Sequence, residues 1–169
     1  MKKTYLLTFV ISLIIVYLAA SFHGKLSEFK SLGLLGIFII NLIGNATVFL
    51  PTPAIASVIA GGMLYPLILV AIVSALGAAI GDMVGFILGR SSKEILIKNH
   101  HRWYIFLRDM FKTHGTLIIL IFALIPNPFF DAVGILAGIF AFPPVYYFVL
   151  VFLGRFIRNI LLANLGAHL

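Results

Sequence analysis

The stretch ALIPNPFFDAVGILAG, residues 123–138, interrupts an otherwise apolar run with two prolines, an asparagine and an aspartate. Proline cannot continue a helix, because it lacks an N–H donor and clashes with the preceding turn. The apolar segments on either side, 116–125 and 132–142, are about 16 Å long as helices. A bilayer core is roughly 30 Å thick, so neither segment can cross it alone. The pattern therefore predicts a re-entrant hairpin over residues 116–142.

Composition indicates an integral membrane protein. Of the 169 residues, 62% are hydrophobic and 10% are charged, and the mean hydropathy is +1.17. This leaves too little polar surface to coat a soluble globule. The chain is treated as a single membrane domain, 1–169. The net charge of +7 is concentrated beside apolar segments, as in cytoplasmic loops, so membrane topology explains it and no nucleic-acid partner is expected.

The predicted fold class is an all-α membrane protein. It has two inverted re-entrant hairpins, about three transmembrane helices and one cytoplasmic amphipathic helix. The predicted transmembrane helices are 4–22, 66–89 and 145–165. The first also has features of a signal peptide, but its length favours a retained helix. A basic amphipathic helix is predicted over 90–115.

A first hairpin is predicted over 31–64, around Pro51 and Pro53, and these two prolines at its tip are predicted to border the substrate path. Its entry segment, 31–50, is long enough for a full span, so the choice between a hairpin arm and a span stays open. One full crossing separates the two hairpins, and they must therefore enter from opposite faces. A shift of 77 residues aligns the halves, placing Pro51 on Pro128, Gly61 on Gly138, Pro66 on Pro143, Gly77 on Gly154 and Gly89 on Gly166. Inverted repeats with broken helices are typical of transporters, whose substrate site lies between the repeats.

Charged residues within the apolar segments are the strongest functional signal, because each is costly at membrane depth. Asp82, Asp131, Arg155 and Arg158 are predicted to line a polar path, in which the arginines hold a phosphate headgroup and a carboxylate balances charge or exchanges protons. Two alternatives stay open. Asp82 and Arg155 could form a structural ion pair, and Arg158 could extend its guanidinium to the membrane surface.

Two further residue sets have predicted roles in the membrane. Small residues at every fourth position form a stripe that lets another helix approach closely: Gly77, Gly81, Gly85 and Gly89. Basic residues in the amphipathic segment suit anionic headgroups, although ordinary positive-inside bias explains them equally well: Arg90, Lys93, Lys98, Arg102, Arg108 and Lys112.

Common catalytic motifs are missing from the sequence. There is no phosphate-binding loop, no G-x-S-x-G motif, no paired histidine ligands and no cysteine. We therefore expect no enzymatic activity, no cofactor and no metal site.

Three sequence stretches resemble the VTT domain of DedA-type and vacuole-membrane-protein-type proteins, the SNARE-associated Golgi protein family. These are GDMVGFILGR (81–90), IPNPFFDAVGILAG (125–138) and LGRFIR (153–158), and the resemblance covers roughly residues 31–165. It implies two opposed re-entrant hairpins and movement of lipids across the bilayer. In that family, eukaryotic members scramble phospholipids, and bacterial DedA members recycle the undecaprenyl phosphate carrier.

The sequence departs from the DedA pattern around both hairpins. The first, NATVFLPTPAIAS, has no acidic residue, and Ala123, Phe129 and Phe130 stand where DedA proteins have arginines. The PNPFFD form is more similar to the vacuole-membrane-protein-type branch.

The function expected from this resemblance is ATP-independent, scramblase-like lipid translocation, with Asn127 and Asp131 at the constriction. An ion-coupled undecaprenyl phosphate transporter and a non-transporting membrane scaffold are the alternatives. The expected partners are membrane lipids, with protons or sodium ions if transport is coupled, and a second copy of the chain could bind. The expected location is a prokaryotic cytoplasmic membrane, with the N-terminus in the cytoplasm.

Overall fold

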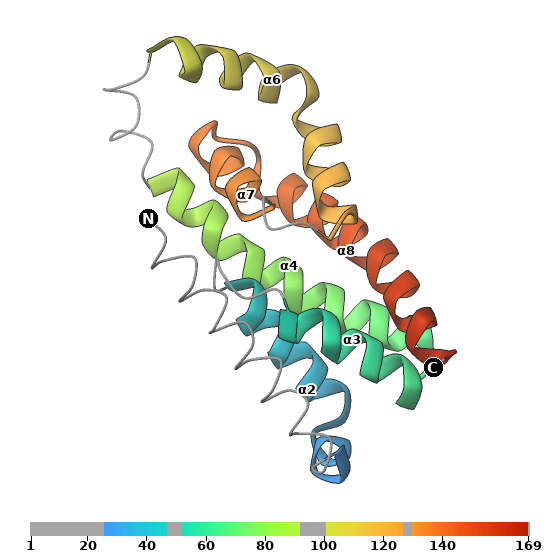
Figure 1. Cartoon of the computed structure of the whole chain (residues 1–169). Coiled ribbons are helices and arrows are strands. Elements are labelled where there is room, and N and C mark those ends of the chain that lie inside the picture. The colour runs from blue at the N-terminus through green and yellow to red at the C-terminus, as the bar shows by residue number, and fades with distance from the viewer. Residues whose placement is uncertain (1–25, 47–51, 92–100, 127–129, 169) are drawn as a thin grey trace, which may run out of the picture.

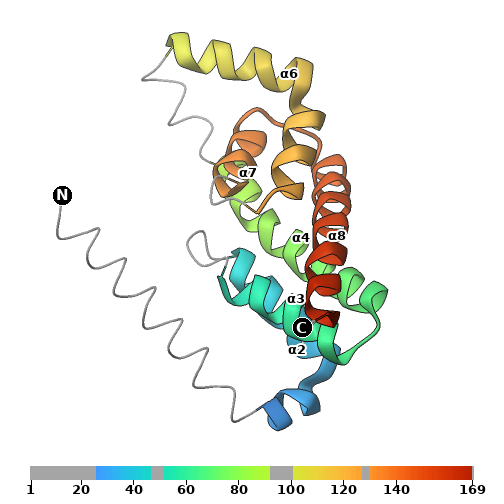
Figure 2. The same cartoon turned by 45° about the vertical axis from the view of Figure 1, so that its right-hand side comes forward.

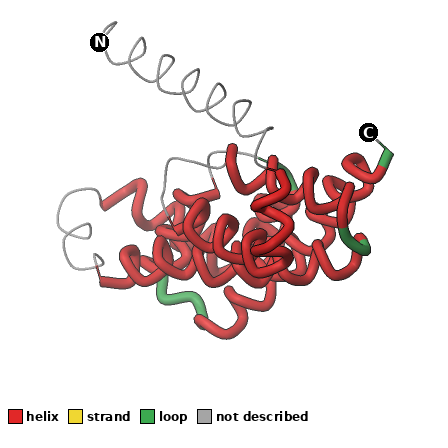
Figure 3. The backbone as a smooth tube through the Cα atoms, turned by 90° about the horizontal axis from the view of Figure 1, so that it is seen from below, coloured by secondary structure: helices red, strands yellow, loops and turns green. Residues whose placement is uncertain are grey.

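The computed structural model describes residues 26–46, 52–91, 101–126 and 130–168. Within these ranges the chain is helical, with no strand (Figure 3), and this confirms the predicted all-α class. Figure 1 shows the order of the helices: α2 (Leu26–Ala46), α3 (Thr52–Leu64), α4 (Leu67–Ser91), α6 (His101–Leu124), α7 (Phe130–Ile139) and α8 (Pro144–Ala167). The predicted helix 4–22 lies outside the described residues.

Two of these helices, α4 and α8, are long and apolar enough to cross a membrane. Their 25 and 24 residues span about 37 and 36 Å. They correspond to the predicted spans 66–89 and 145–165. Helix α8 begins at Pro144, a position where the missing N–H of proline costs nothing.

The remaining apolar helices are too short to cross a bilayer. Helices α3 and α7 have 13 and 10 residues, or about 20 and 15 Å. In α2 the backbone is non-helical at Gly33, with φ 51° and ψ −139°. The part that follows this break, Gly33–Ala46, is about 21 Å long. The end of the predicted segment 31–50 lies outside the described residues, so the choice between a hairpin arm and a full span stays open.

Helix α6 differs from the sequence expectation. The predicted amphipathic helix ended at residue 115 and the hairpin arm began at 116, but one helix runs from His101 to Leu124. Glycine at position 115 weakens a helix without ending it. Figure 2 shows that α6 bends partway along its length, so that its first part lies across one end of the molecule. The start of α2 lies at the opposite end in the same view.

The two halves of the chain are interlocked by their short helices. Helix α3 packs against α8, and α7 packs against α4, so each short helix contacts the long helix of the other half. Helix α2 packs against α4, and α6 packs correspondingly against α8. The pattern of helix contacts therefore repeats between the α2–α4 and α6–α8 halves.

Glycine contacts repeat with the same symmetry. A Cβ at Gly89 of α4 would strike the backbone carbonyl of Ile135 in α7, and a Cβ at Gly166 of α8 would strike that of Ile59 in α3. The two glycines are 77 residues apart, as predicted, whereas Ile59 and Ile135 are 76 apart. The short helices thus follow a shift of 76.

One predicted pairing changes with this shift. Gly138 lies against the carbonyl of Phe86, and Gly62 lies against that of Ala163. Gly62, and not Gly61, is therefore the counterpart of Gly138. The sequence comparison missed this because Gly61 and Gly62 are adjacent, and a single shift for the whole chain selects the wrong one.

Candidate functional site

A buried ion pair joins the two long helices. In α8, Arg155 donates from Nε to Asp82 Oδ2 at 3.1 Å and from NH2 to Asp82 Oδ1 at 3.2 Å. The residues are 5% and 4% exposed. The two-point geometry fixes both side chains, as is typical of arginine–carboxylate pairs. The structure thus brings together two residues that the sequence placed at membrane depth.

The long helices are antiparallel at this contact. Phe86, near the end of α4, stacks on Tyr147, near the start of α8, with ring centroids 4.7 Å apart. Ser74, nearer the start of α4, contacts Asn159, further along α8. The Asp82–Arg155 pair lies between these two contacts.

The glycine stripe of α4, which also carries Asp82, lets other helices pack closely on this helix. Gly77 and Gly81 face the backbone of α2, where a Cβ would strike the carbonyls of Phe38 and Leu42. Gly89 faces α7 in the same way. At Gly85, an added Cβ would lie 3.9 Å from its nearest neighbouring atoms, which is ordinary van der Waals contact. Helices α2 and α7 therefore approach α4 closely, while the Asp82 carboxylate itself lies against Arg155 of α8.

The start of α7 adds an aromatic ring and a second carboxylate. The guanidinium of Arg155 lies 4.4 Å from the ring centroid of Phe130, a cation–π distance. The next residue, Asp131, is half-buried in the first turn of α7. It interacts electrostatically with Arg155 and with Asp82.

Arg158 lies one turn beyond Arg155 and is 5% exposed. Its Nε and NH2 groups both donate to Asn159 Oδ1, at 3.1 and 3.0 Å. Asn159 Nδ2 donates to Ser74 Oγ at 2.8 Å, and Ser74 donates onward to the Val70 carbonyl. Among the described residues, no carboxylate lies within salt-bridge distance of Arg158.

Sequence reasoning missed Asn159 and Ser74. A signal for Asn159 was present, because it stands 77 residues after Asp82 and occupies the matching position in the repeat. Ser74 gave no comparable signal, since serine is common in membrane helices and its counterpart is Val151. We call Asp82, Asp131, Arg155, Arg158, Asn159 and Ser74 the polar cluster.

Other predicted site residues lie outside the polar cluster or outside the described part of the chain. Pro53 is exposed in the first turn of α3 and takes no part in the hydrogen bonds or the ion pair of the cluster. Pro51 and Asn127 lie outside the described residues.

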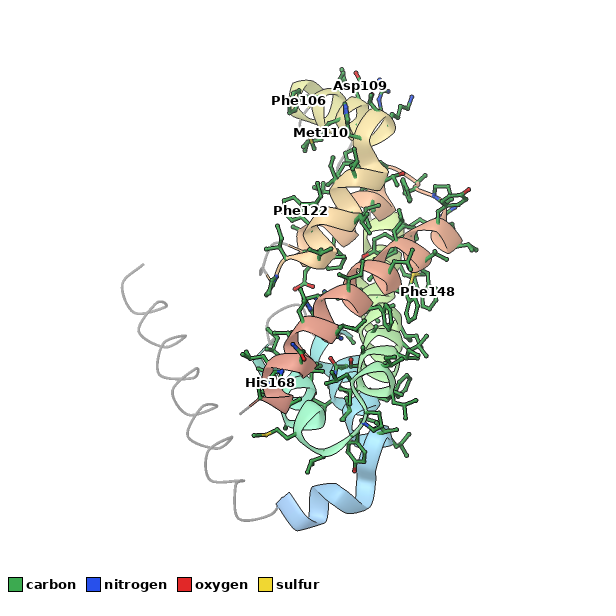
Figure 4. All side chains as sticks on the ribbon, turned by 90° about the vertical axis from the view of Figure 1, so that its right-hand side faces the viewer. Phe106, Asp109, Met110, Phe122, Phe148 and His168 are labelled. Atoms are coloured by element: carbon green, nitrogen blue, oxygen red, sulfur yellow. The ribbon has the colours of Figure 1, made fainter. Side chains whose placement is uncertain are left out.

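The predicted basic surface is described only in part. Arg90 and Lys112 are exposed, and Arg108 pairs with Asp109 at 3.2 Å. Figure 4 shows Asp109 on α6 at one end of the molecule, far along the axis from His168. Lys93 and Lys98 lie outside the described residues, as does the side chain of Arg102.

A second polar contact, not predicted, links the first two described helices. Asn41 of α2 is fully buried and donates to Ser57 Oγ of α3 at 3.0 Å and to the Ile37 carbonyl. Its Oδ1 has no hydrogen-bond partner among the described residues, and neither does the buried hydroxyl of Tyr147.

Comparison with protein families finds a match to the VTT domain over residues 50–168. No curated protein and no solved structure matches the chain. The matched region includes α3, α4, α6, α7 and α8, and thus both long apolar helices and the whole polar cluster. The chain is a membrane protein that belongs to the VTT domain family.

Proposed function

We propose that this protein moves lipids across the bilayer without ATP, by letting a polar headgroup pass between two opposed re-entrant hairpins. The hairpins are α2–α3 and the apolar end of α6 with α7. The observation that carries the proposal is the polar cluster, which lies where the two long helices cross. Its two carboxylates and two guanidinium groups balance one another in charge.

The short helices support the re-entrant arrangement. Each is shorter than a bilayer core, and each packs on the long helix of the opposite half. Backbone that breaks at membrane depth must be covered by protein or by water. Because α3 packs on α8 and α7 packs on α4, protein covers the helical arms beside the two proline-containing breaks.

Arg158 is the residue best suited to hold a lipid phosphate. Arginine has five N–H donors, and the two donor atoms that bind Asn159 leave three N–H groups without an acceptor among the described residues. A buried guanidinium with spare donors stabilises an anion strongly. Asp131 is only half-buried, so the polar cluster reaches the protein surface at this residue.

Topology and location follow the sequence expectation. The basic segment 90–115 and Lys2 with Lys3 support a cytoplasmic N-terminus, and the location that we propose is a prokaryotic plasma membrane. The similarity of PNPFFD to the vacuole-membrane-protein-type branch favours a scramblase over carrier recycling.

The test is lipid flipping in reconstituted liposomes that contain a fluorescent phospholipid in both leaflets. Dithionite, added outside, should bleach nearly all of the fluorescence with the protein and about half of it without. Arg158→Gln should slow flipping about tenfold or more, because a charge-assisted contact is lost. Arg90→Gln, the same change at an exposed site, should leave the rate unchanged. Wild-type protein that leaves half of the fluorescence protected would contradict the proposal.

Two alternative functions are separated by the same assay. Flipping that needs a proton or sodium gradient would instead support the ion-coupled transporter of undecaprenyl phosphate. A membrane scaffold is favoured by one observation, the nearly complete burial of Asp82 and Arg155 against each other. A scaffold would show no flipping under any gradient, although the protein is folded.

A further inference from the structure

In each half of the protein, one glycine of the first described helix lies against an aromatic side chain, and we call Gly33 of α2 and Gly115 of α6 the elbow glycines. In α2, a Cβ at Gly33 would lie 3.6 Å from the hydroxyl of Tyr65. In α6, a Cβ at Gly115 would lie 3.1 Å from Cε2 of Phe142. Both aromatic residues directly precede a proline that leads into a long helix. An aromatic side chain therefore lies against the elbow glycine in each half, through its hydroxyl at Gly33 and through its ring at Gly115.

The sequence before each elbow glycine also recurs. Residues 29–33 read FKSLG and residues 111–115 read FKTHG, 82 positions apart. The same shift relates Gly33 to Gly115, whereas the aromatic residues are 77 apart. A lysine thus stands three residues before the elbow glycine in both halves, although the intervening residues differ.

At the second elbow, this lysine borders a groove. The groove has a volume of about 270 Å³ and is lined by Phe111, Lys112, Phe140, Ala141, Phe142 and Pro143. The rings of Phe111 and Phe140 pack with centroids 5.3 Å apart. Apart from Lys112, the lining residues have aromatic or aliphatic side chains.

The position of the groove is that of a membrane interface. Pro143 directly precedes α8, a helix that is long enough to cross the bilayer. The first residues of that helix, Val145 and Tyr146, are 72% and 67% exposed. An exposed tyrosine at the end of a membrane helix is typical of the headgroup layer.

The charge on Lys112 is available for a ligand. The neighbouring carboxylate on the same helix, Asp109, pairs with Arg108 at 3.2 Å. Lys112 is exposed and forms no ion pair within the described part of the chain. A cation above an apolar aromatic surface complements a molecule that joins a phosphate to hydrocarbon.

We propose that the groove at Lys112 binds an anionic glycerophospholipid, with its phosphate on the ammonium group and its glycerol and upper acyl carbons against the phenylalanine rings. The site lies on the surface, apart from the polar cluster, and does not depend on whether lipids are translocated. It would hold the protein at a defined depth beside anionic lipid.

Native mass spectrometry of the detergent-purified full chain tests the site, with phosphatidylglycerol and phosphatidylcholine as probes. Wild-type protein should retain phosphatidylglycerol in preference to phosphatidylcholine. Lys112→Gln should weaken phosphatidylglycerol binding about fivefold, the effect expected of one lysine at a lipid surface. Lys112→Arg should restore it.

Arg108→Gln is the matched control, because it removes the same charge from the same helix at a side chain that does not line the groove. Equal losses in Lys112→Gln and Arg108→Gln would overturn the proposal in favour of general surface charge. Glycerol phosphate that competes as well as the intact lipid would also overturn it, by showing a site for a free anion. Melting temperatures of the three variants within a few degrees of wild type would show that each is folded.

Discussion

Asp82 and Asn159 occupy equivalent positions in the two halves of the protein, and both are buried where α4 and α8 cross. Asp82 accepts two hydrogen bonds from Arg155, whereas Asn159 accepts from Arg158 and donates to Ser74. The equivalent positions in the two halves therefore make different contacts between α4 and α8: Asp82 makes a charged contact with Arg155, and Asn159 makes a neutral contact with Ser74. This difference leaves Arg158 without a carboxylate partner among the described residues.

Removing the negative charge of the buried pair should destabilise the protein. Asp82→Asn leaves the Arg155 guanidinium buried without its counter-ion, which typically costs about 3–5 kcal/mol. We expect a marked fall in the thermal unfolding temperature in detergent, measured by tryptophan fluorescence or circular dichroism.

The double substitution Asp82→Leu with Arg155→Met is the control. Replacing a whole buried ion pair by apolar side chains of similar size is often neutral or stabilising. The double variant should therefore unfold at a higher temperature than Asp82→Asn. An equally unstable double variant would show that shape, and not the unpaired charge, sets the cost.

The repeated close contacts of the glycines predict large effects from one added methyl group. Gly89→Ala and Gly166→Ala each place a Cβ against a backbone carbonyl, which cannot rotate away. We expect each change to lower the stability by about 1–3 kcal/mol, as overpacked sites do.

Gly85→Ala is the control for these glycines, since Gly85 lies on the same helix as Gly89 and an added Cβ would have its nearest neighbouring atoms 3.9 Å away. It should be neutral or stabilising by up to about 1 kcal/mol, the gain from alanine in a helix interior. A similar loss of thermal stability in all three variants would contradict the symmetric packing.

Much of the helical architecture could be predicted from the sequence, because prolines and segment length are local signals. The prolines near 66 and 143 correctly placed the starts of both long helices, and the length of the apolar segment 132–142 predicted a short helix, which is α7. The sequence did not reveal that the amphipathic segment and the following apolar segment form one continuous helix, α6. Its amphipathic and apolar parts differ in composition, but Gly115 alone does not decide whether the backbone breaks there or only bends.

The polar cluster could be predicted only where its residues were charged. Charge at membrane depth identified Asp82 and Arg155, whereas Ser74 and Asn159 depend on the register between two helices that lie 85 residues apart in sequence at this contact. That register belongs to the three-dimensional packing of α4 against α8 and leaves no local signal in the sequence. No single sequence shift reveals it, because the short helices follow a shift of 76 and the long ones 77.

The turn after α7 carries backbone strain that a single substitution should relieve. Ala141 has φ 56°, in the left-handed region. The Phe142 N–H donates to the Ala137 carbonyl, and the Ala141 N–H donates to the Gly138 carbonyl. This is a Schellman motif, in which glycine is preferred at the position of Ala141. Ala141→Gly should stabilise the protein by roughly 0.5–1 kcal/mol. Ala137→Gly, inside the helix, should do the opposite, and an unfolding temperature that falls in both variants would contradict this assignment.

The hydroxyl of Tyr147 should limit what the facing glycine can become. It is buried without a hydrogen-bond partner among the described residues, and it lies 2.6 Å from the position of a Cβ at Gly134. Tyr147→Phe removes a buried polar group that makes no bond, so it should be neutral or stabilising by about 1 kcal/mol. Gly134→Ala alone should be destabilising, because the new methyl group meets that oxygen.

In the double variant the same methyl group should be tolerated, since its next neighbours are Cζ of residue 147 at 3.7 Å and the Asp82 carbonyl at 3.9 Å. A double-mutant cycle of unfolding free energies in detergent should therefore give a favourable coupling of about 1 kcal/mol or more. Additive effects would mean that residues 134 and 147 are not in contact. A Tyr147→Phe protein that loses stability would mean that the hydroxyl binds water or lipid, and flipping measured on that variant would then show whether the contact belongs to the translocation path.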